Sequence, residues 1–593
     1  MSARTRRNLA LALAIVLELV VGVGTLSVRH GRTVTSGHGP STTAAPDTSV
    51  GGPLAVESTT TTKAASAPSG PVRVSPGPGM VKVSWDRVPG SVRLYSVEAT
   101  DQATGYSGTV FACGTCTEAT FQHLVDGHQY TFVVSAYKGA GPVSPRRSPV
   151  ATPTSPLCPP GPCLAVDPDV SLGPATQREQ GFLHGITDGT DPGRVTALHL
   201  RSWRGAGGPQ QASIVGRYTK NTSQIMSDYW TTATYDLDKG GVKPPWDDWG
   251  AYEAFVSQTV QKAKGEGWAP QYWDALNEPD AGLAPYYRGT VLTLDRIFEL
   301  YAHTYKAIRD GDSHARIVAP SISGFTVAYD PKNPLVFDLP RFLSYAAAHD
   351  LRFDAIGWHE TFAAHLRAFD STPEAIASHV ASMRAMLTQW PSLGHPTILI
   401  NEYIGSPDLD IPGWRVAYLS ALEDAGAEDA GASCSPDAWG DVSGCLLGTL
   451  GGLLGKDRAT PRGPYWVHLA YANMKGTRVG VSSSVPNVSG YATAKSGEPV
   501  KVLIGRHQSC VAALNKLCHE PASATPGPTP LRVVIRVGGA DRTVPVTIER
   551  IPDTAEDMPN ISGPLQQVPV RNGVVQVVLP SVADGDAYAV TAG

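Results

Sequence analysis

Apolar and polar residues alternate along residues 71–154, which is the pattern of half-buried β-strands. The segments 81–85 and 130–137 show this period of two most clearly. Turn residues such as Gly127 lie between such runs. The pattern therefore predicts an all-β domain in this part of the chain.

A different pattern begins near residue 172 and continues to 475. Short apolar runs alternate with segments such as 252–263 and 294–308, in which apolar residues recur every three or four positions and predict helices. The expected strands are 182–186, 195–201, 224–229, 271–277, 316–321, 353–358, 397–402 and 465–469. Strands and helices that alternate in this way predict a (β/α)8 barrel.

Residues 476–593 again predict β-structure. The segments 500–504, 531–537 and 574–579 are rich in β-branched residues and are separated by Gly, Pro and Asp. We expect a C-terminal β-sandwich that packs beside the barrel. No residue cluster in it suggests chemistry of its own, so a supporting role is the expectation.

The start of the chain predicts export rather than a folded domain. Three arginines precede an apolar run at 9–28, which is typical of a secretory signal within residues 1–30. Because the run is nearly long enough to span a bilayer, an uncleaved membrane anchor stays open as an alternative. The Ser-, Thr- and Pro-rich residues 31–70 predict a flexible linker. A second Pro-rich stretch, 155–171, predicts a hinge before the barrel.

Cysteine usage agrees with export. The chain has 8 cysteines. They form four close pairs along the sequence: Cys113/Cys116, Cys158/Cys163, Cys434/Cys445 and Cys510/Cys518. An even number in local pairs, behind an export signal, favours disulfides. A zinc half-site at Cys113 and Cys116 is the alternative, but no second Cys or His pair at metal spacing lies nearby.

Two glutamates carry the candidate chemistry. Glu278 and Glu402 each end an apolar run, and these runs are the fourth and seventh expected strands. In a (β/α)8 barrel the functional groups gather at the carboxyl ends of the strands, so both side chains should face one cleft. A rim salt bridge would explain one such glutamate alone. Two carboxylates in one cleft are what cleavage of a glycosidic bond requires.

The sequence also resembles known families. The Asn-Glu-Pro motif at 277–279, together with Glu402, resembles the acid/base and nucleophile of the retaining clan A glycoside hydrolases. Within that clan, the segments 353–359 and 463–468 and the β-rich tail resemble family 39, the β-xylosidases and α-iduronidases. This resemblance implies a TIM barrel as the catalytic domain.

The N-terminal β-domain, residues 71–154, resembles a fibronectin type III domain. The resemblance rests on Trp85 and on Leu124, Gly127 and Tyr130, which have the spacing of a tyrosine corner. Domains of this type act mostly as spacers or binding modules. Since no exposed row of aromatic residues argues for sugar binding, we expect a spacer.

The clan resemblance implies double displacement. Glu402 would attack the anomeric carbon, while Glu278 would act first as general acid and then as general base. Six further residues are candidate substrate contacts: Asn277, His359, Tyr403, Trp466, His199 and Arg201. A satisfied structural histidine at 359 and a core tryptophan at 466 are equally open readings. Glu360 is more typical of a rim charge than of a third catalytic carboxylate.

We therefore expect a secreted or membrane-anchored glycoside hydrolase that acts on cell-wall or plant-type glycans. Its partner is a carbohydrate, and neither a cofactor nor a metal is expected. The net charge of -5 leaves no basic surface for a nucleic acid. A catalytically inactive, carbohydrate-binding cell-surface protein is the alternative. The presence of both Glu278 and Glu402 favours the enzyme, because a binding protein has no need of both charges.

Overall fold

The structure is a computed structural model of the chain. It describes residues 70–105, 107–138, 142–234, 244–280, 292–326, 337–361, 372–405, 408–435, 442–507 and 528–593. The expected export segment, the linker up to residue 69, and the pair Cys510 and Cys518 lie outside these ranges. Within them, no helix combines the length and apolar character needed to cross a bilayer.

The N-terminal domain consists of two antiparallel sheets, as the alternating pattern predicts. One sheet contains β1 (Arg73–Gly77), β2 (Met80–Ser84) and β5 (Glu118–Phe121). The other contains β3 (Leu94–Asp101), β4 (Ser107–Cys113), β6 (Tyr130–Tyr137) and β7 (Pro142–Arg147). The backbone N–H of Val125 donates to Tyr130 Oη at 3.0 Å, so the predicted tyrosine corner is present.

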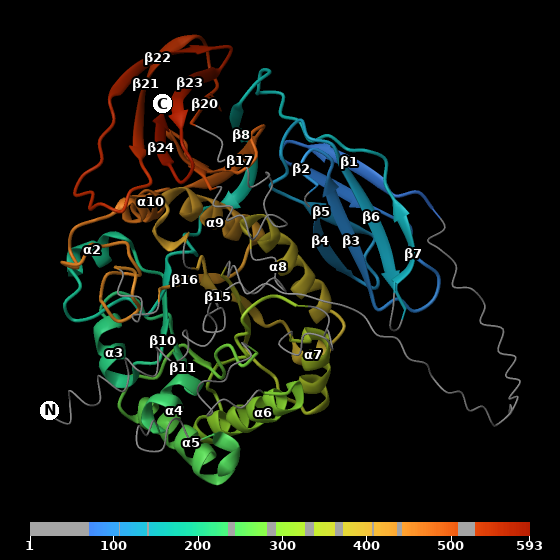
Figure 1. Ribbon diagram of the computed structural model, residues 1–593, viewed down its shortest axis with the longest axis vertical. Helices are drawn as coiled ribbons and strands as arrows, with labels where there is room; N and C mark the ends of the chain where they lie inside the picture. Colours follow the sequence, from blue (N-terminus) through green and yellow to red (C-terminus); the bar gives the residue numbers. More distant parts are fainter. Residues whose placement is uncertain are drawn as a thin grey trace, which may run out of the picture.

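The middle of the chain forms a closed barrel of parallel strands (Figure 1). Its strands in chain order are β9 (Gly181–Leu183), β10 (Ser202–Gly205), β11 (Thr222–Ile225), β12 (Tyr272–Asp274), β13 (Ile317–Val318), β14 (Ala355–Glu360), β15 (Thr397–Tyr403) and β16 (Asp429–Ala432). The helices around them are α2 (Pro192–Ala197), α3 (Gly208–Val215), α4 (Met226–Thr234), α5 (Trp249–Gly265), α6 (Leu294–Gly311), α7 (Leu339–Ala348), α8 (Pro373–Leu387), α9 (Pro412–Ala425) and α10 (Gly463–Ala472). Such a closed eight-stranded parallel sheet is consistent with a TIM-like barrel.

Two of the expected barrel strands are wrong. The segment 195–201 falls on α2 and the turn after it, because Asp191 caps this helix by accepting from Arg194 N at 2.9 Å. The true second strand is β10. The segment 465–469 lies inside α10, and the eighth strand is the short β16 instead. The third strand is also shorter than expected, since α4 begins at Met226.

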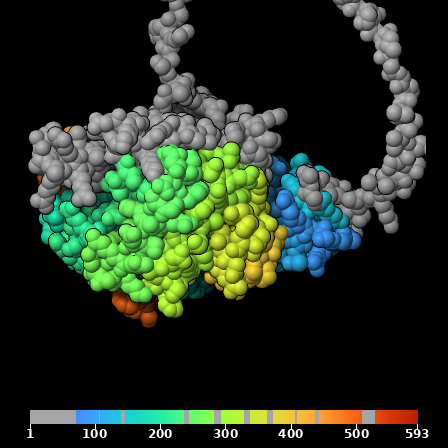
Figure 2. Space-filling view, turned by 90° about the horizontal axis from the view of Figure 1, so that it is seen from below, coloured from blue at the N-terminus to red at the C-terminus, as the bar shows by residue number. Residues whose placement is uncertain are grey.

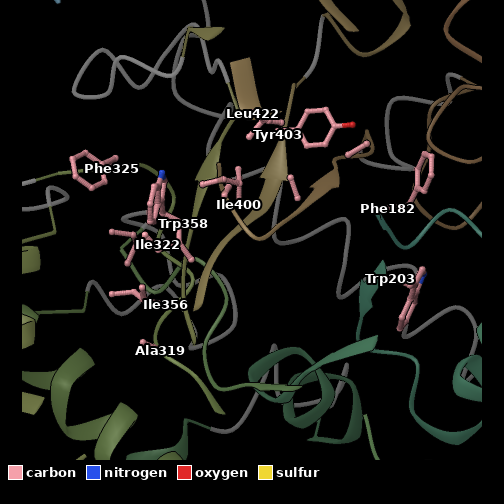
Figure 3. Packing of buried hydrophobic residues seen from close by; sticks show 14 of the residues in the cluster. Phe182, Trp203, Ala319, Ile322, Phe325, Ile356, Trp358, Ile400, Tyr403 and Leu422 are labelled. Atoms are coloured by element: carbon pink, nitrogen blue, oxygen red, sulfur yellow. The ribbon is translucent and has the colours of Figure 1, made fainter. Parts of the chain in front are cut away.

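The barrel core is apolar and tightly packed. Figure 3 shows part of it, with Phe325 and Trp358 on one side, where their ring centroids lie 5.2 Å apart. Trp358 and Ile400 are fully buried and come from the paired strands β14 and β15. These two strands therefore have a fixed register at the level just below Glu402.

The C-terminal part is a closed sheet rather than a hinge followed by a sandwich. Its strands are β17 (Thr477–Ser483), β18 (Val488–Ala494), β19 (Val500–Arg506), β20 (Thr529–Arg536), β21 (Arg542–Ile551), β22 (Leu565–Arg571), β23 (Val574–Val582), β24 (Ala587–Ala592) and, from before the barrel, β8 (Cys163–Pro174). Most of the expected hinge 155–171 is thus the strand β8, which pairs with β17 and β20.

The prolines that suggested a hinge are accommodated by irregular pairing. Pro168 lies between the pairs Asp167–Gly480 and Ser171–Val479, where the β8–β17 register shifts. A proline is tolerated in a sheet at such a bulge, because no ladder hydrogen bond is needed from it there. The local disulfide Cys158–Cys163 staples the start of β8, and Cys113–Cys116 and Cys434–Cys445 are also formed, as expected.

The N-terminal domain packs directly on the other two parts, which differs from the free spacer expected from its family. Strand β4 lies against α8, and Phe111 N donates to Ser382 Oγ at 2.9 Å. Asp126 N donates to the carbonyl of Ser483 in β17 at 2.8 Å. Figure 2 shows the side that packs on the barrel from below, with the blue domain against the yellow part of the barrel.

A buried acidic cluster joins the barrel to the C-terminal sheet. The hydroxyl of Tyr471 in α10 is hydrogen-bonded to Glu179, which precedes β9, and lies 2.8 Å from Glu423 Oε1 in α9. A tyrosine has a single proton to donate, so it satisfies one carboxylate in its charged form. Both glutamates are fully buried. Burial, reinforced by the charge of Glu423, raises the pKa of Glu179 well above its usual value.

This cluster predicts how stability depends on pH. Folded Glu179 keeps its proton above the unfolded-state pKa of about 4.3, so unfolding releases the proton and the free energy of unfolding falls as the pH rises, by up to about 1.4 kcal/mol per pH unit. In the variant Glu179→Gln this contribution is absent. Its melting temperature, measured from pH 5 to 7, should therefore fall less steeply than that of the wild type. The variant Glu98→Gln, at an exposed position of β3, is the control, and equal slopes for Glu179→Gln and wild type would contradict the assignment.

Candidate active site

Glu278 and Glu402 lie together at the carboxyl ends of the barrel strands. Glu278 follows β12, where Asn277 forms an isolated bridge with Ser321, and Glu402 lies near the end of β15. One carboxylate oxygen of each glutamate and one ring nitrogen of His359 lie within 4.8 Å of one another. The Glu278 side chain is 28% exposed and that of Glu402 is 12% exposed.

Local irregularities of the backbone aim these side chains. Trp358 pairs with Ile400 and His359 with Glu402, so Asn401 is an extra residue in β15. Such a bulge turns neighbouring side chains to the same side, and Asn401 Nδ2 indeed donates to Asp274 inside the barrel at 2.9 Å. Glu278 has a φ of 38°, a conformation that costs a non-glycine residue on the order of 1 kcal/mol or more.

Arg204 at the end of β10 is the centre of the site. Its Nε donates to Asp274 Oδ2 at 2.8 Å and its Nη1 to Glu402 Oε1 at 2.8 Å. Its Nη2 donates to Asn277 Oδ1 at 2.7 Å. The guanidinium is buried, and the nearby carboxylates raise the pKa of Arg204 against the opposing effect of desolvation. Arg204 thus stays charged and links the second, fourth and seventh strands.

Glu402 receives a second hydrogen bond from the eighth strand. Ser433, directly after β16, donates from Oγ to Glu402 Oε2 at 3.2 Å. The next residue, Cys434, is disulfide-bonded to Cys445, and the buried disulfide packs with Leu183 and other apolar residues at the strand ends. The loop that carries Ser433 is therefore held at the barrel mouth.

His359 lies between the two glutamates. Its Nδ1 is 2.7 Å from Glu278 Oε1, and its Nε2 is 3.6 Å from Glu402 Oε1. Complete burial lowers the pKa of His359 to about 4, although the charge of Glu402 opposes this. The imidazole is consequently neutral near pH 7. A neutral ring supplies one N–H and one lone pair, so it does not compensate both carboxylates as a cation would.

Two further acids, Asp280 and Asp228, are close enough to the pair to feel its charge. Asp280 accepts from Ser323 N at 2.9 Å and from Ser323 Oγ at 3.0 Å, which anchors the chain just after Glu278. Burial raises the pKa of Asp280 to about 7, and it also raises that of Asp228, in the first turn of α4, to about 7. Both acids are therefore partly protonated at neutral pH.

The other expected contacts divide into two groups. Asn277 and His359 lie with the glutamates. Tyr403 does not, because neighbours on a strand point to opposite sides. It is fully buried in the apolar cluster of Figure 3, and its hydroxyl donates to the carbonyl of Glu179 at 3.0 Å. Glu360 is likewise turned away, and its Oε1 lies 2.8 Å from His379 Nδ1.

Three expected contacts lie away from the strand ends that carry the glutamates. His199 and Arg201 are exposed and precede β10, so they belong to the amino end of that strand. Trp466 lies on α10, and its Nε1 donates to the carbonyl of Met558 in the C-terminal part at 2.8 Å. The structure therefore does not bring these residues to Glu278 and Glu402.

Sequence reasoning missed Arg204 and Ser433. Arg204 was missed because the second strand was placed on 195–201, and the signal that could have corrected this is Asp191-Pro192, a helix start. Ser433 follows β16, whose four residues are Asp, Ala, Gly and Ala. Such a strand has no apolar pattern to detect, because its neighbours supply the burial.

The donor set could also hold a small cation. Glu278, His359 and Glu402 offer two carboxylate oxygens and one imidazole nitrogen, which are ligands of several divalent metals. Against this, the guanidinium of Arg204 already occupies Glu402 Oε1. A cation bound to the same oxygen would lie next to the positively charged guanidinium. Like charges repel each other strongly in a buried site, so Arg204 disfavours a bound cation.

Comparison with known proteins assigns one domain of the chain. Residues 66–152 match the fibronectin type III domain family, which agrees with the expected 71–154. A comparison of the sequence with curated proteins finds no match.

Comparison of the structure with solved structures shows a shared fold. N2152 from Neocallimastix frontalis aligns with a TM-score of 0.54 and 16% identity, over 73% of this chain and 99% of that chain. A glucosidase from Croceicoccus marinus aligns with a TM-score of 0.51 and 14% identity, over 73% and 98%. A GH39 β-xylosidase from Caulobacter crescentus aligns with a TM-score of 0.45 and 13% identity, over 72% and 99%, too remote to support a family assignment. The chain thus contains a fibronectin type III domain and, over 73% of its length, shares a fold with N2152 and the glucosidase.

Proposed function

We propose that the protein is a retaining glycoside hydrolase in which Glu402 is the nucleophile and Glu278 the acid/base. The observation that carries this proposal is the pairing of two carboxylates within 4.8 Å in unlike surroundings. Glu402 accepts hydrogen bonds from Arg204 and Ser433, which orient both oxygens of its carboxylate. Glu278 is the more exposed of the two and faces a neutral imidazole instead of a cation.

The separation of the carboxylates supports retention over inversion. Retaining enzymes hold the two carboxyl groups about 5–5.5 Å apart, and inverting enzymes about 6.5–9.5 Å apart, so that a water fits between sugar and base. The closest oxygens here lie within 4.8 Å. A nucleophilic carboxylate can therefore reach the sugar directly, while the second carboxyl group reaches the leaving oxygen.

The reaction would proceed in two steps. In the first, Glu278 gives its proton to the glycosidic oxygen, the bond from that oxygen to the anomeric carbon breaks, and a carboxylate oxygen of Glu402 bonds to this carbon. In the second, Glu278 takes a proton from water, and the resulting nucleophile displaces Glu402. Each step inverts the anomeric carbon, so the product retains its configuration.

Asn277 would orient the sugar. Its Oδ1 accepts from Arg204, so its Nδ2 points away from the guanidinium. The Nδ2 amide group would then donate to a sugar hydroxyl. His359 would act as a positioning residue between the carboxylates. We include the substrate in this proposal: cell-wall or plant-type glycans, among them those that family 39 enzymes cleave. A glucosidase has the same fold.

We also propose an extracellular location. The three disulfides of the described residues form in oxidising compartments and are rare in the cytosol. The apolar run at 9–28 would act as the signal or as a membrane anchor.

Substitution of each glutamate should give a distinct kinetic result. Glu402→Gln should abolish turnover of all glycosides. Glu278→Gln should lower kcat/KM for natural oligosaccharides by about 10²–10⁴-fold, but kcat/KM for aryl glycosides with good leaving groups much less, since their departure needs no proton. With both substrates kcat should fall, because Glu278 also activates the water of the second step. Initial rates and NMR of the first-formed anomer are the measurements, with Glu253→Gln as the control.

An inverted product would refute the nucleophile assignment. A wild type without turnover, but with sugar binding equal to that of Glu402→Gln, would favour the inactive binding protein.

Ser433 offers a test of the hydrogen bond on the nucleophile. Ser433→Ala removes one bond to Glu402, which is worth about 0.5–1.5 kcal/mol, so kcat should fall about 2- to 10-fold with KM nearly unchanged. Ser433→Thr, which keeps the hydroxyl, should recover most of the rate. The control is Ser420→Ala, which removes a buried serine hydroxyl outside the site. Equal effects of Ser433→Ala and Ser420→Ala on kcat would contradict the role of Ser433.

The charge of Arg204 predicts that activity needs no divalent metal. Dialysis against EDTA should leave the initial rate unchanged, and added Zn²⁺ or Mn²⁺ should not raise it. A rate that is lost on chelation and restored by one of these ions would instead assign Glu278, His359 and Glu402 as ligands.

A further inference from the structure

We propose a second carbohydrate-binding site in the crevice between the fibronectin type III domain and helix α8. The crevice has a volume of about 220 Å³. Drug-sized pockets have about 300–1,000 Å³, so this one accommodates a single sugar ring rather than a long segment of glycan. Clefts between domains are common positions for ligand sites. The binding itself goes beyond the proposed hydrolase activity and does not depend on it.

One wall of the crevice is the outer face of β4. Ser107, Thr109 and Phe111 line it and alternate with Val110 and Ala112, which are buried in the core of the domain. This alternation is the normal consequence of the strand period of two. The outer face thus offers one aromatic ring and two hydroxyl groups. Phe111 is only partly buried, which leaves part of its ring to contact the apolar face of a pyranose.

The opposite wall belongs to the barrel. Phe325, which follows β13, stacks on His379 of α8 with ring centroids 4.6 Å apart. Ser378 lies beside them in the first turns of α8. Since α8 follows the carboxyl end of β14, this wall lies at the same end of the barrel as Glu278 and Glu402.

Several polar groups of the crevice have no partner among the residues that the structure describes. The side chains of Thr109, Gln122 and Ser378 form no hydrogen bond with another residue of the described ranges. An amide and two hydroxyls supply both donors and acceptors. Sugar hydroxyls are complementary to such a set, because each hydroxyl can donate and accept.

The charges of the crevice select a neutral ligand. Among the described residues, its lining contains the carboxylates Asp101 and Glu374 and neither Lys nor Arg. Asp101 Oδ2 lies 2.8 Å from His128 Nδ1, and Glu374 Oε1 lies 2.8 Å from His507 Nε2, so both acids are already engaged. Within this part of the chain an anionic sugar would meet two carboxylates and no guanidinium or ammonium group. The ligand is therefore a neutral, hydroxyl-bearing pyranose unit.

The crevice is also connected to the barrel mouth. His379 Nδ1 lies 2.8 Å from Glu360 Oε1, and Glu360 is the neighbour of His359 on β14. The packing of β4 on α8 thus gives the fibronectin type III domain a direct part in the surface beside the strand ends. A glycan bound there lies next to the end of the barrel that carries the two glutamates.

Calorimetric titration of the full chain tests this site. Xylotetraose and cellotetraose are titrated into Glu402→Gln, which prevents turnover, and we expect two binding events with at least one of the two probes. Thr109→Trp in the same background fills the crevice and should leave one event. Thr120→Trp, on the exposed face of β5, is the matched control and should keep both. A single event in Glu402→Gln with both probes, or two events in the Thr109→Trp variant, would overturn the proposal.

A smaller substitution separates loss of binding from misfolding caused by Thr109→Trp. Gln122→Ala should weaken only the second event, by about 3- to 10-fold, because one hydrogen bond is lost. Thr120→Ala should leave both affinities unchanged. If Glu402→Gln with Gln122→Ala binds the tetrasaccharide in the second event as tightly as Glu402→Gln alone, the assigned lining is refuted.

Tetragalacturonate should not bind in the crevice, and its binding there would overturn the assignment of a neutral ligand. Absent turnover in the wild type with the second event preserved would refute the hydrolase and leave this site standing.

Discussion

The buried guanidinium of Arg204 is the interaction on which the site depends. A buried cation is costly unless it is fully paired, and Arg204 meets this condition through Asp274, Glu402 and Asn277. These three partners come from strand ends on both sides of the barrel axis. Any shift of one strand would leave a charge unpaired, so the electrostatics and the register of the barrel constrain each other.

This constraint also explains the irregular backbone at the two glutamates. A regular β15 would turn either Asn401 or Glu402 outward, whereas the bulge allows Asn401 to reach Asp274 and Glu402 to reach Arg204. At Glu278 the positive φ is held by the bond from Glu278 N to Ser321 O at 2.7 Å and by the anchored Asp280 beyond it. Strained conformations persist where the surroundings over-determine them.

The sequence predicted those parts of the site that are encoded locally. Glu278 and Glu402 end apolar runs long enough to be recognised as strands, and helices α5 and α6 have clear periodicity. Arg204 and Ser433 could not be found in this way. Arg204 lies on β10, whereas the apolar pattern places the second strand on 195–201, and the burial of β16 comes from β15 and β9 rather than from its own side chains.

The same reason explains the errors outside the barrel. The prolines of β8 argue against a strand and so predict a hinge, while the bulges that accommodate them lie in β8 itself and appear only in its pairing with β17. The fibronectin type III domain was expected to be a spacer because its own sequence shows no binding feature.

The packing of the fibronectin type III domain on α8 and β17 depends on pairs of residues far apart in the chain, such as Phe111 with Ser382 and Asp126 with Ser483. Local patterns describe elements, whereas contacts between elements decide whether a domain is a spacer or a wall of a site. A crevice formed by β4 and α8 therefore exists only in the folded chain. Its polar lining is a property of neither domain alone.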